Sequence, residues 1–201
     1  MLVVIDYGVG NIGSIISMIR KIGFDAVYSS DPAVIQQADK LILPGVGSYD
    51  KAMIELKRRD LLPILNEEVI NKKKQILGIC LGAQILGKSS EEGELPGLGW
   101  IDMQVKKFKT DNLRVPHIGW NFVKYKRTSY FASDLNEVEN RFYFVHSYFM
   151  ECASEENILG TTYYGSEFAS FVNKDNIFGV QFHPEKSHKY GFNLLKSFIN
   201  A

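Results

Sequence analysis

The sequence has few cysteines, no excess of charge of one sign and no long hydrophobic run. Only two of its 201 residues are cysteines, Cys80 and Cys152, which argues against a secreted disulfide scaffold and favours a reducing cytoplasm. Basic and acidic residues number 23 each, and this balance argues against a partner such as nucleic acid or a membrane surface, held through positive charge. No segment approaches the roughly 18 apolar residues of a membrane span, and the first residues lack the basic region of a signal peptide.

The sequence also lacks the common motifs for nucleotides and metals. It has no Walker loop and no Gly-x-Gly-x-x-Gly after an expected strand, and neither His117 nor His146 stands at metal-ligand spacing from another ligand. We therefore expect no cofactor and no metal. Apolar residues make up 45% of the chain and charged residues 23%, which is typical of a globular protein. The length, without a repeat or a linker, predicts one domain over residues 1–201.

The first half of the chain alternates apolar runs with helical patterns. Residues 2–5 form a continuous apolar run, typical of a strand covered on both faces. Isoleucines from Ile12 to Ile22 recur at helical spacing, and Gly23 is placed to end that helix. Further strands are expected at 24–28, 41–43 and 75–79, and helices at 49–73, with a break near Pro63, and from Leu81. This alternation predicts an α/β fold with a doubly wound, mostly parallel central sheet.

The second half has a different pattern, rich in aromatic and β-branched residues between clusters of Gly, Asn and Asp. These features predict further strands in a mixed or antiparallel extension of the sheet, followed by a last helix at 190–199. The segments expected to be extended are 101–108, 119–125, 142–149, 158–164, 168–173 and 177–183.

The most informative motif is Gly78-Ile79-Cys80-Leu81-Gly82, which has the form of a nucleophile elbow with cysteine in place of serine. A nucleophile on a sharp turn from strand to helix leaves little room two positions away on either side, which explains both glycines. The start of the helix favours a thiolate, and the N–H of Leu81 is placed to stabilise an oxyanion. A buried cysteine that ends a hydrophobic strand is the simpler alternative.

A second motif, His183-Pro184-Glu185, follows an apolar strand pattern. Residues two apart on an extended chain point to the same side, so His183 and Glu185 are expected to be neighbours. A thiol nucleophile needs a base, and the base needs an acid to hold it in the correct tautomer. The two motifs together predict a Cys80–His183–Glu185 triad, although the second motif alone also suits the end of a surface strand.

A third motif, Pro44-Gly45-Val46-Gly47, leaves the strand expected at 41–43. Its glycines allow the backbone to turn its amides toward a ligand, as an oxyanion hole requires. A plain tight turn explains the same residues equally well.

The elbow and the His-Pro-Glu motif together resemble the triad-type (class I) glutamine amidotransferases. Within that family the chain resembles most the glutaminase subunits of imidazole glycerol phosphate synthases. The resemblance implies a flavodoxin-like fold and extends over nearly the whole chain. The matching strings lie, in order, at 5–11, 43–47, 78–84, 89–93, 97–100, 115–121, 144–148 and 179–187.

The resemblance implies a reaction, the hydrolysis of L-glutamine to glutamate and ammonia through a thioester on Cys80. His183 would act as base and then as acid, with Glu185 orienting it. The N–H of Leu81 and an amide of the turn at Val46 and Gly47 would form the oxyanion hole. In the family this turn is thought to need a backbone flip before its amide faces the site, which would keep the free subunit nearly idle.

The resemblance also assigns binding residues. The positions that hold glutamine in the family fall here on Gln84, Glu92, Ser147 and Tyr148. A carboxylate such as Glu92 suits the α-ammonium of the substrate, but Glu91 and Glu92 also suit a solvated turn. The positions at or near the subunit interface fall on Asn11, Trp120, Asn121 and Lys186. An exposed tryptophan is a typical interface anchor, and the alternative is a Trp120 packed in its own core.

A partner is implied because nothing in the chain resembles a second substrate site. In the family the ammonia passes directly to a (βα)₈-barrel cyclase, the synthase subunit of a heterodimer. That subunit makes imidazole glycerol phosphate and aminoimidazole carboxamide ribotide in histidine biosynthesis. Gly13 stands where the family often has Arg, and Ala83 and Ile118 stand where it usually has Met. These departures leave open a paralogous glutaminase subunit that feeds a sugar amidotransferase in surface-polysaccharide biosynthesis.

The other histidines and the second cysteine have simpler expected roles. His146 is expected to be a half-buried strand residue beside the pocket, and His188 a surface residue. Cys152, in a polar, loop-like stretch, is expected to be a spare thiol. Two further classes stay open: a cysteine hydrolase of the same fold that needs no partner, and a binding subunit without catalysis. The complete triad argues against the second.

Overall fold

The computed structural model describes residues 1–109, 113–127 and 140–201, and its main sheet has the strand order β2-β1-β3-β4-β13-β12-β10-β6-β5. The first part of this sheet is parallel, as predicted. Its strands are β1 (Leu2–Ile5), β2 (Ala26–Ser29), β3 (Lys40–Leu43), β4 (Gln75–Ile79) and β13 (Ile177–Val180). The doubly wound parallel half of the fold is therefore confirmed.

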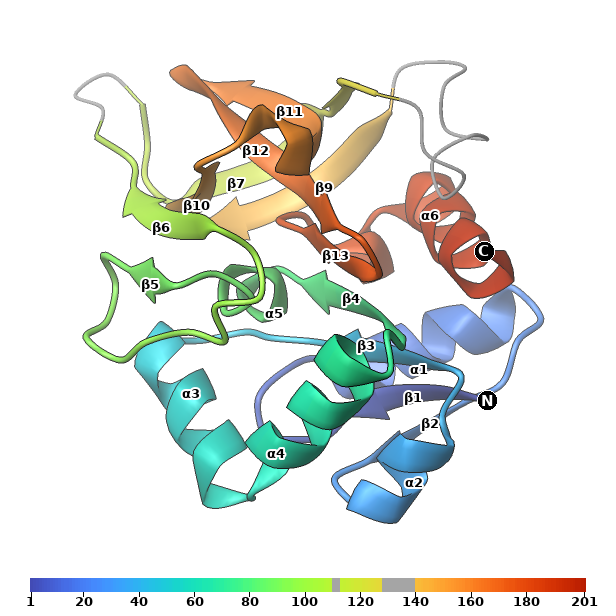
Figure 1. Cartoon of the computed structure of the whole chain (residues 1–201). Helices are drawn as coiled ribbons and strands as arrows, with labels where there is room; N and C mark the ends of the chain where they lie inside the picture. The colour runs from blue at the N-terminus through green and yellow to red at the C-terminus, as the bar shows by residue number, and fades with distance from the viewer. Residues whose placement is uncertain (110–112, 128–139) are drawn as a thin grey trace.

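The remainder of the sheet is mixed, and this extension is also confirmed. Antiparallel pairing joins β13 to β12 (Ser166–Lys174), β12 to β11 (Ile158–Tyr164) and β10 (Tyr148–Cys152), and β10 to β6 (Met103–Lys107). The short strands β5 (Ser89–Ser90) and β8 (Lys124–Tyr125) pair with β6 and β11. A separate antiparallel ribbon pairs β7 (His117–Phe122) with β9 (Arg141–His146) (Figure 1).

Helices cover both faces of the parallel strands (Figure 1). One face packs against α2 (Pro32–Gln37), α3 (Tyr49–Arg58) and α4 (Leu61–Asn66), which continues as a π-helical turn over Glu67–Asn71. The other face packs against α1 (Ile12–Lys21) and α6 (His188–Asn200). None of the helices in the described ranges combines the length and apolarity that crossing a bilayer requires.

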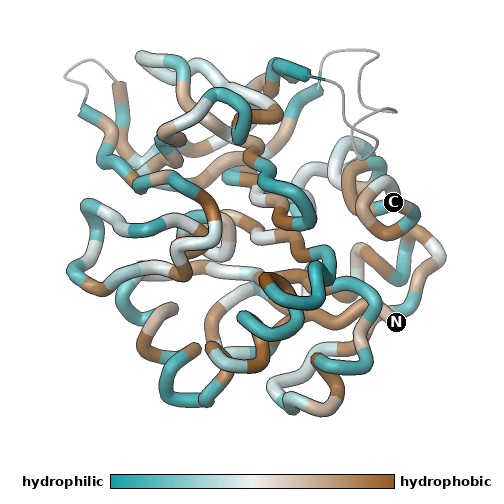
Figure 2. The backbone as a smooth tube through the Cα atoms, in the orientation of Figure 1, coloured by the Kyte–Doolittle hydropathy of each residue, from teal (hydrophilic) through white to brown (hydrophobic). Residues whose placement is uncertain are grey.

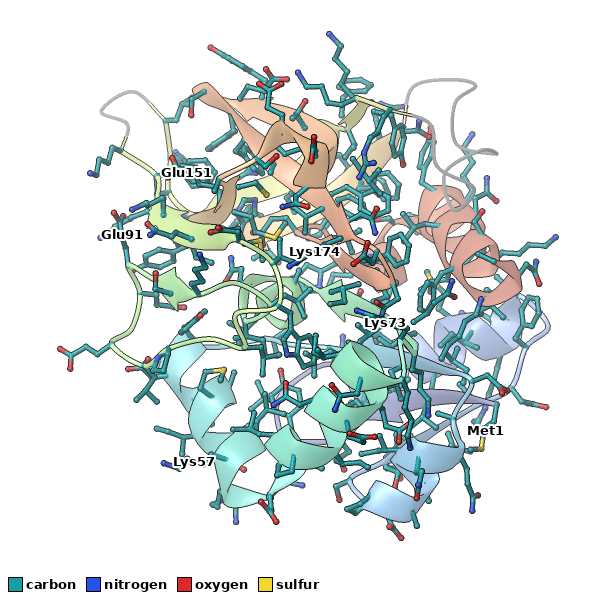
Figure 3. The ribbon with its side chains drawn as sticks, in the orientation of Figure 1. Met1, Lys57, Lys73, Glu91, Glu151 and Lys174 are labelled. Atoms are coloured by element: carbon teal, nitrogen blue, oxygen red, sulfur yellow. The ribbon has the colours of Figure 1, made fainter. Side chains whose placement is uncertain are left out.

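The alternation of side chains along β1 explains these two layers. Val3 and Ile5 belong to the core under α2–α4, whereas Leu2 and Val4 belong to the core under α1 and α6. The hydrophobic segments accordingly run through the centre of the molecule (Figure 2). Charged side chains such as Lys57 and Glu91 lie at its periphery (Figure 3).

Several element boundaries differ from expectation. The helical stretch breaks at Asp60, whose φ is 54°, because Pro63 falls in the first turn of α4, where no backbone N–H is needed. The segment expected as one strand at 142–149 is two strands, β9 and β10. The short helix α2 is not predicted by the apolar pattern. It begins at a proline and is capped by Asp31, whose side chain accepts from the N–H of Ala33 at 2.8 Å.

Candidate active site

Cys80 lies at the turn between β4 and the short helix α5 (Leu81–Gln84). Its φ of 54° and ψ of −111° form a conformation that non-glycine residues rarely adopt, and its N–H donates to the carbonyl of Val180 at 2.7 Å. A Cβ on Gly78 would lie 2.7 Å from the carbonyl oxygen of Gly82, and one on Gly82 would lie 1.9 Å from that of Leu43. Both flanking glycines are therefore required by close backbone approach, as in a nucleophile elbow.

The Pro-Gly-Val-Gly turn packs directly against this elbow. A Cβ on Gly45 would lie 2.4 Å from the backbone nitrogen of Gly82, so only glycine permits the approach. Tyr7 anchors the turn from the core, because its buried hydroxyl donates to the carbonyl of Pro44 at 2.5 Å. Leu81 is the first residue of α5, a position whose N–H has no partner within the helix. The turn and the N-terminus of α5 thus stand side by side.

His183 follows β13 and is held by its neighbours. Its Nδ1 lies 2.7 Å from Oε1 of Glu185, and the two side chains are 2% and 1% exposed. Glu185 belongs to a 3₁₀ turn over Pro184–Lys186, and Ser187 Oγ donates to the carbonyl of His183 at 2.6 Å. The second ring nitrogen, Nε2, is buried without a hydrogen-bond partner among the described residues. It is therefore the nitrogen that can exchange a proton.

The charges around His183 favour its protonated form. Burial alone opposes the charge, but the interactions with Cys80 and with Glu185 outweigh burial and raise the pKa of His183 to about 10. The His183 ring is therefore protonated at neutral pH. Because this pKa exceeds the ordinary value of 6.5, the charged ring stabilises the fold below about pH 6.5, and that contribution is lost as the pH rises through about 10.

Replacing Cys80 with alanine is expected to lower the pKa of His183, because the strongest attraction that offsets burial is removed. The measurement is a titration of the His183 ring followed by NMR, in the unsubstituted chain and in Cys80→Ala. We expect the first curve to reach its midpoint well above the second. Equal midpoints would show that Cys80 and His183 are not electrostatically coupled.

Gln181 also belongs to the site, although it is not among the site residues predicted from the sequence. It is fully buried, and its Nε2 faces Cys80 Sγ at 3.8 Å. Its Oε1 accepts from Nε2 of Gln84 at 3.0 Å. Gln181 stands two residues before His183, in the same short string as the His-Pro-Glu motif, so the signal was present in the sequence.

A pocket of about 700 Å³ opens at this end of the sheet. It brings together most of the site residues predicted from the sequence, from six separate segments of the chain. Glu185, Trp120 and Asn121 are not among its lining residues. The selected residues that line it are Asn11, Val46, Gly47, Cys80, Leu81, Gln84, Glu92, Ser147, Tyr148, His183 and Lys186.

Glu92 is half-buried at the pocket, unlike its exposed neighbour Glu91. Its Oε2 accepts from the backbone N–H of Tyr49 at 3.0 Å. Burial raises the pKa of the Glu92 carboxyl in spite of this hydrogen bond. A partly desolvated carboxylate gains more from a cationic ligand than a solvated one does, so Glu92 suits an ammonium group.

Trp120 is 45% exposed, so the alternative in which it packs in its own core is wrong. Its ring stacks on that of exposed His188, with centroids 5.7 Å apart and an interplanar angle of 8°. Ile118 and Phe122, two residues away on either side of Trp120 in β7, are 59% and 49% exposed. These three side chains form an exposed apolar stripe, which we call the β7 stripe.

Two expectations about spare residues need correction. His146 is 6% exposed and therefore fully buried rather than half-buried, because it faces the aromatic core between β9 and β12. Cys152 is the last residue of β10 rather than part of a loop. Burial and the nearby Asp102 raise the pKa of Cys152 to about 12, so this thiol is a poor nucleophile.

The chemistry available at the pocket is that of an activated thiol. Among the described residues no group of three or more His, Cys, Asp or Glu side chains is arranged to hold a metal ion. The pocket offers a cysteine on an elbow, a histidine backed by a carboxylate, and backbone N–H groups near the sulfur. This arrangement suits acyl transfer from an amide or an ester.

Comparison with known proteins points to the same chemistry. The family model for class-I glutamine amidotransferases matches residues 3–201. "Imidazole glycerol phosphate synthase subunit HisH 2" of Methanococcus maripaludis is 54% identical over 200 residues, which cover 99% of this chain and 98% of that protein. The protein of the same name in Pseudomonas aeruginosa is 50% identical with the same coverage, and subunit HisH of Leptospira interrogans is 43% identical over the full length of both chains.

Solved structures agree on the fold. The structure of PurLQS from Thermotoga maritima superposes with a TM-score of 0.78 at 19% identity, covering 99% of this chain and 97% of that one. A crystal structure described as a glutamine amidotransferase gives a TM-score of 0.75 at 16% identity, with coverage of 98% and 97%. With a family model that spans nearly the whole sequence, the chain belongs to the class-I glutamine amidotransferases.

Proposed function

We propose that this chain is the glutaminase subunit of an imidazole glycerol phosphate synthase, which hydrolyses L-glutamine and passes the ammonia to a synthase subunit in a heterodimer. The observation that carries the proposal is the meeting of Cys80 and His183, with Glu185 hydrogen-bonded to His183, at one pocket. The full-length relatives that bear this name support the pathway, histidine biosynthesis.

The first half of the reaction forms a thioester. The Cys80 thiolate attacks the amide carbon of glutamine, and the carbonyl oxygen takes up the negative charge. The N–H of Leu81, with that of Val46 or Gly47, stabilises this oxyanion. His183 then gives its Nε2 proton to the amide nitrogen, and the C–N bond breaks to release ammonia.

The second half frees the enzyme. His183, now neutral, takes a proton from water, which attacks the thioester carbon. The C–S bond breaks, and glutamate leaves as the Cys80 thiolate is restored. Glu185 keeps the proton of the ring on Nδ1 in the neutral state, which leaves Nε2 free for each transfer.

The substrate is held by the remaining pocket residues. Glu92 pairs with the α-ammonium of glutamine, and Gln84, Ser147 and Tyr148 contact its other polar groups. The observation that supports these roles is that all four residues line the same pocket as Cys80. Ammonia is lost as unreactive ammonium if it reaches solvent, so a partner must cover the outlet.

The β7 stripe supports a partner at this face of the molecule. Ile118, Trp120 and Phe122 expose apolar side chains next to one another, and such surfaces commonly mark protein interfaces. Asn11 and Lys186 line the same pocket, and the resemblance assigns both to the subunit interface. A synthase docked over β7 and this pocket would enclose the ammonia.

The experiment is a coupled assay with the purified chain and a purified cyclase subunit of the histidine pathway. We expect imidazole glycerol phosphate to form with glutamine as the only nitrogen source. Glutamate release should rise by on the order of 10² to 10³ in the complex, the effect of completing one oxyanion donor.

Other outcomes would contradict the proposal in distinct ways. Rapid glutamate release by the chain alone would identify a self-sufficient hydrolase. Activation only by an ATP-dependent sugar synthase would identify the paralogous branch. Absence of glutamate with either partner would identify a binding subunit.

A further inference from the structure

Two buried histidines that the proposed reaction does not use lie beside the pocket. His117 in β7 and His146 in β9 are paired directly across the ribbon, and they are 3% and 6% exposed. Nδ1 of His117 lies 3.0 Å from Nε2 of His146. The His117 ring is fixed between Phe144 and Tyr164, with stacked centroids 4.8 and 4.0 Å away. The pair is therefore built into the core rather than placed there loosely.

The surroundings determine where the protons lie. Nδ1 of His146 is 2.7 Å from the carbonyl oxygen of Tyr148, which can only accept, so this nitrogen carries the proton. Nε2 of His146 must then accept from Nδ1 of His117. Nε2 of His117 in turn accepts from the side-chain amide of Asn121 at 3.2 Å. Burial lowers the pKa of His117 to about 4 and that of His146 to about 3, so both rings stay neutral at physiological pH.

The hydrogen bonds from Asn121 through His117 and His146 to Tyr148 form a series, and its inner end leads to the nucleophile. The carbonyl of Tyr148 accepts a second hydrogen bond, from Nε2 of Gln84 at 3.0 Å. The same amide donates to Gln181, whose own amide faces Cys80 Sγ. The position of the Tyr148 carbonyl therefore affects both Gln84 in the pocket wall and the group next to the sulfur.

The outer end reaches the β7 stripe. Asn121 stands between Trp120 and Phe122, which are both exposed. Its Oδ1 accepts from the N–H of Phe122 at 2.8 Å, and its Nδ2 also donates to the carbonyl of Tyr163 at 3.0 Å. A partner that covers the stripe would contact β7, the strand that contains Asn121 and His117.

We propose that His117 and His146 are positioning residues that link the docking strand β7 to the glutamine pocket through the Tyr148 carbonyl. The inference rests on the proposed function, because Tyr148 and Gln84 are taken there to hold glutamine. The hydrogen bonds run in one direction, from Asn121 to Tyr148, so no member can be reversed without leaving a buried donor or acceptor unpaired.

The test compares His117→Phe with His117→Gln in the complex with the cyclase subunit. Phenylalanine keeps the stacking on Phe144 and Tyr164 but cannot donate or accept. Glutamine keeps one donor for His146 and one acceptor for Asn121. We expect His117→Phe to raise the KM for glutamine by at least about fivefold, with a smaller change in kcat, and His117→Gln to restore KM toward that of the unsubstituted complex.

A KM that is unchanged in His117→Phe would overturn the inference. Equal losses of activity in His117→Phe and His117→Gln would also overturn it if they follow the fraction of folded protein measured by thermal unfolding. That pattern would indicate a role in packing alone. If the unsubstituted complex makes no glutamate, the proposed function fails instead, whatever the histidine variants do.

A second variant tests the series without relying on a core substitution. Asn121→Asp replaces the donor next to His117 with an acceptor, and it lies at the partly exposed end. We expect the proton of His117 to move from Nδ1 to Nε2, which ¹⁵N NMR of the ring nitrogens detects, and KM for glutamine to rise. Nδ1-protonated rings in the unsubstituted chain and a shifted tautomer in the variant support the series. An unshifted tautomer in Asn121→Asp, or Nε2-protonated rings in the unsubstituted chain, would refute it.

Discussion

Replacing Cys80 with alanine is expected to lower glutamate formation by on the order of 10⁴ or more, because no other group at the pocket can form the thioester. Alanine removes only the sulfur atom and adds no polar group, so the variant should fold and bind the partner as the unsubstituted chain does. The measurement is the initial rate of glutamate release in the complex, with circular dichroism and complex formation as checks of the fold.

The matched control is Cys152→Ala. Cys152 lies in β10 with a pKa raised to about 12, so it holds its proton and contributes no nucleophile. Replacing Cys152 should change the rate of glutamate release by no more than a small change in stability would. A Cys80→Ala complex that still forms glutamate at an appreciable rate would remove Cys80 from the mechanism.

Replacing His183 with glutamine is expected to lower the rate by on the order of 10³ to 10⁴, because glutamine cannot carry a proton between water, the sulfur and the leaving nitrogen. Glutamine is chosen because its amide can donate to Glu185, which now bonds the ring at 2.7 Å, and so avoids a buried unpaired carboxylate. Steady-state rates in the complex measure the loss.

The size of the combined loss tests whether the groups act as a unit. The double variant Cys80→Ala with His183→Gln should be no slower than Cys80→Ala alone, because each substitution stops the same step. The rate of the Glu185→Gln complex should lie between those of the single variants and that of the unsubstituted complex, because this substitution weakens only the orientation of the His183 ring. If the losses of rate in the two single variants multiplied in the double variant, Cys80 and His183 would not act in the same step.

The sequence alone predicts the local parts of the site. The glycines of the elbow follow from the turn itself, and the structure gives each one a backbone neighbour that a Cβ would strike. The neighbouring of His183 and Glu185 is also predicted, but the structure achieves it through the 3₁₀ turn over Pro184–Lys186 and not through the extended chain that the prediction assumes. The alternation of strands and helices likewise indicates the parallel half of the sheet.

Contacts between distant segments could not be predicted in this way. Cys80 and His183 share a pocket because β13 pairs with β4 in parallel, with Val180 beside Ile79, although about 100 residues separate them. The pairing of His117 with His146 depends on the register of the ribbon, and no local pattern specifies that register. Gln181 was missed for a different reason. Its position two residues before His183 is visible in the sequence, but no known motif marks a glutamine that will be buried beside a cysteine.

The central claim is that Cys80 is a nucleophile activated by His183, and site-specific alkylation tests it most directly. The complex is treated at neutral pH with a glutamine analogue that carries an electrophilic carbon at the position of the amide, and the modified peptide is identified by mass spectrometry. We predict one adduct, on Cys80, which free glutamine slows and His183→Gln suppresses. Preferential modification of Cys152, or labelling of Cys80 at a rate that neither glutamine nor the loss of His183 changes, would contradict the account.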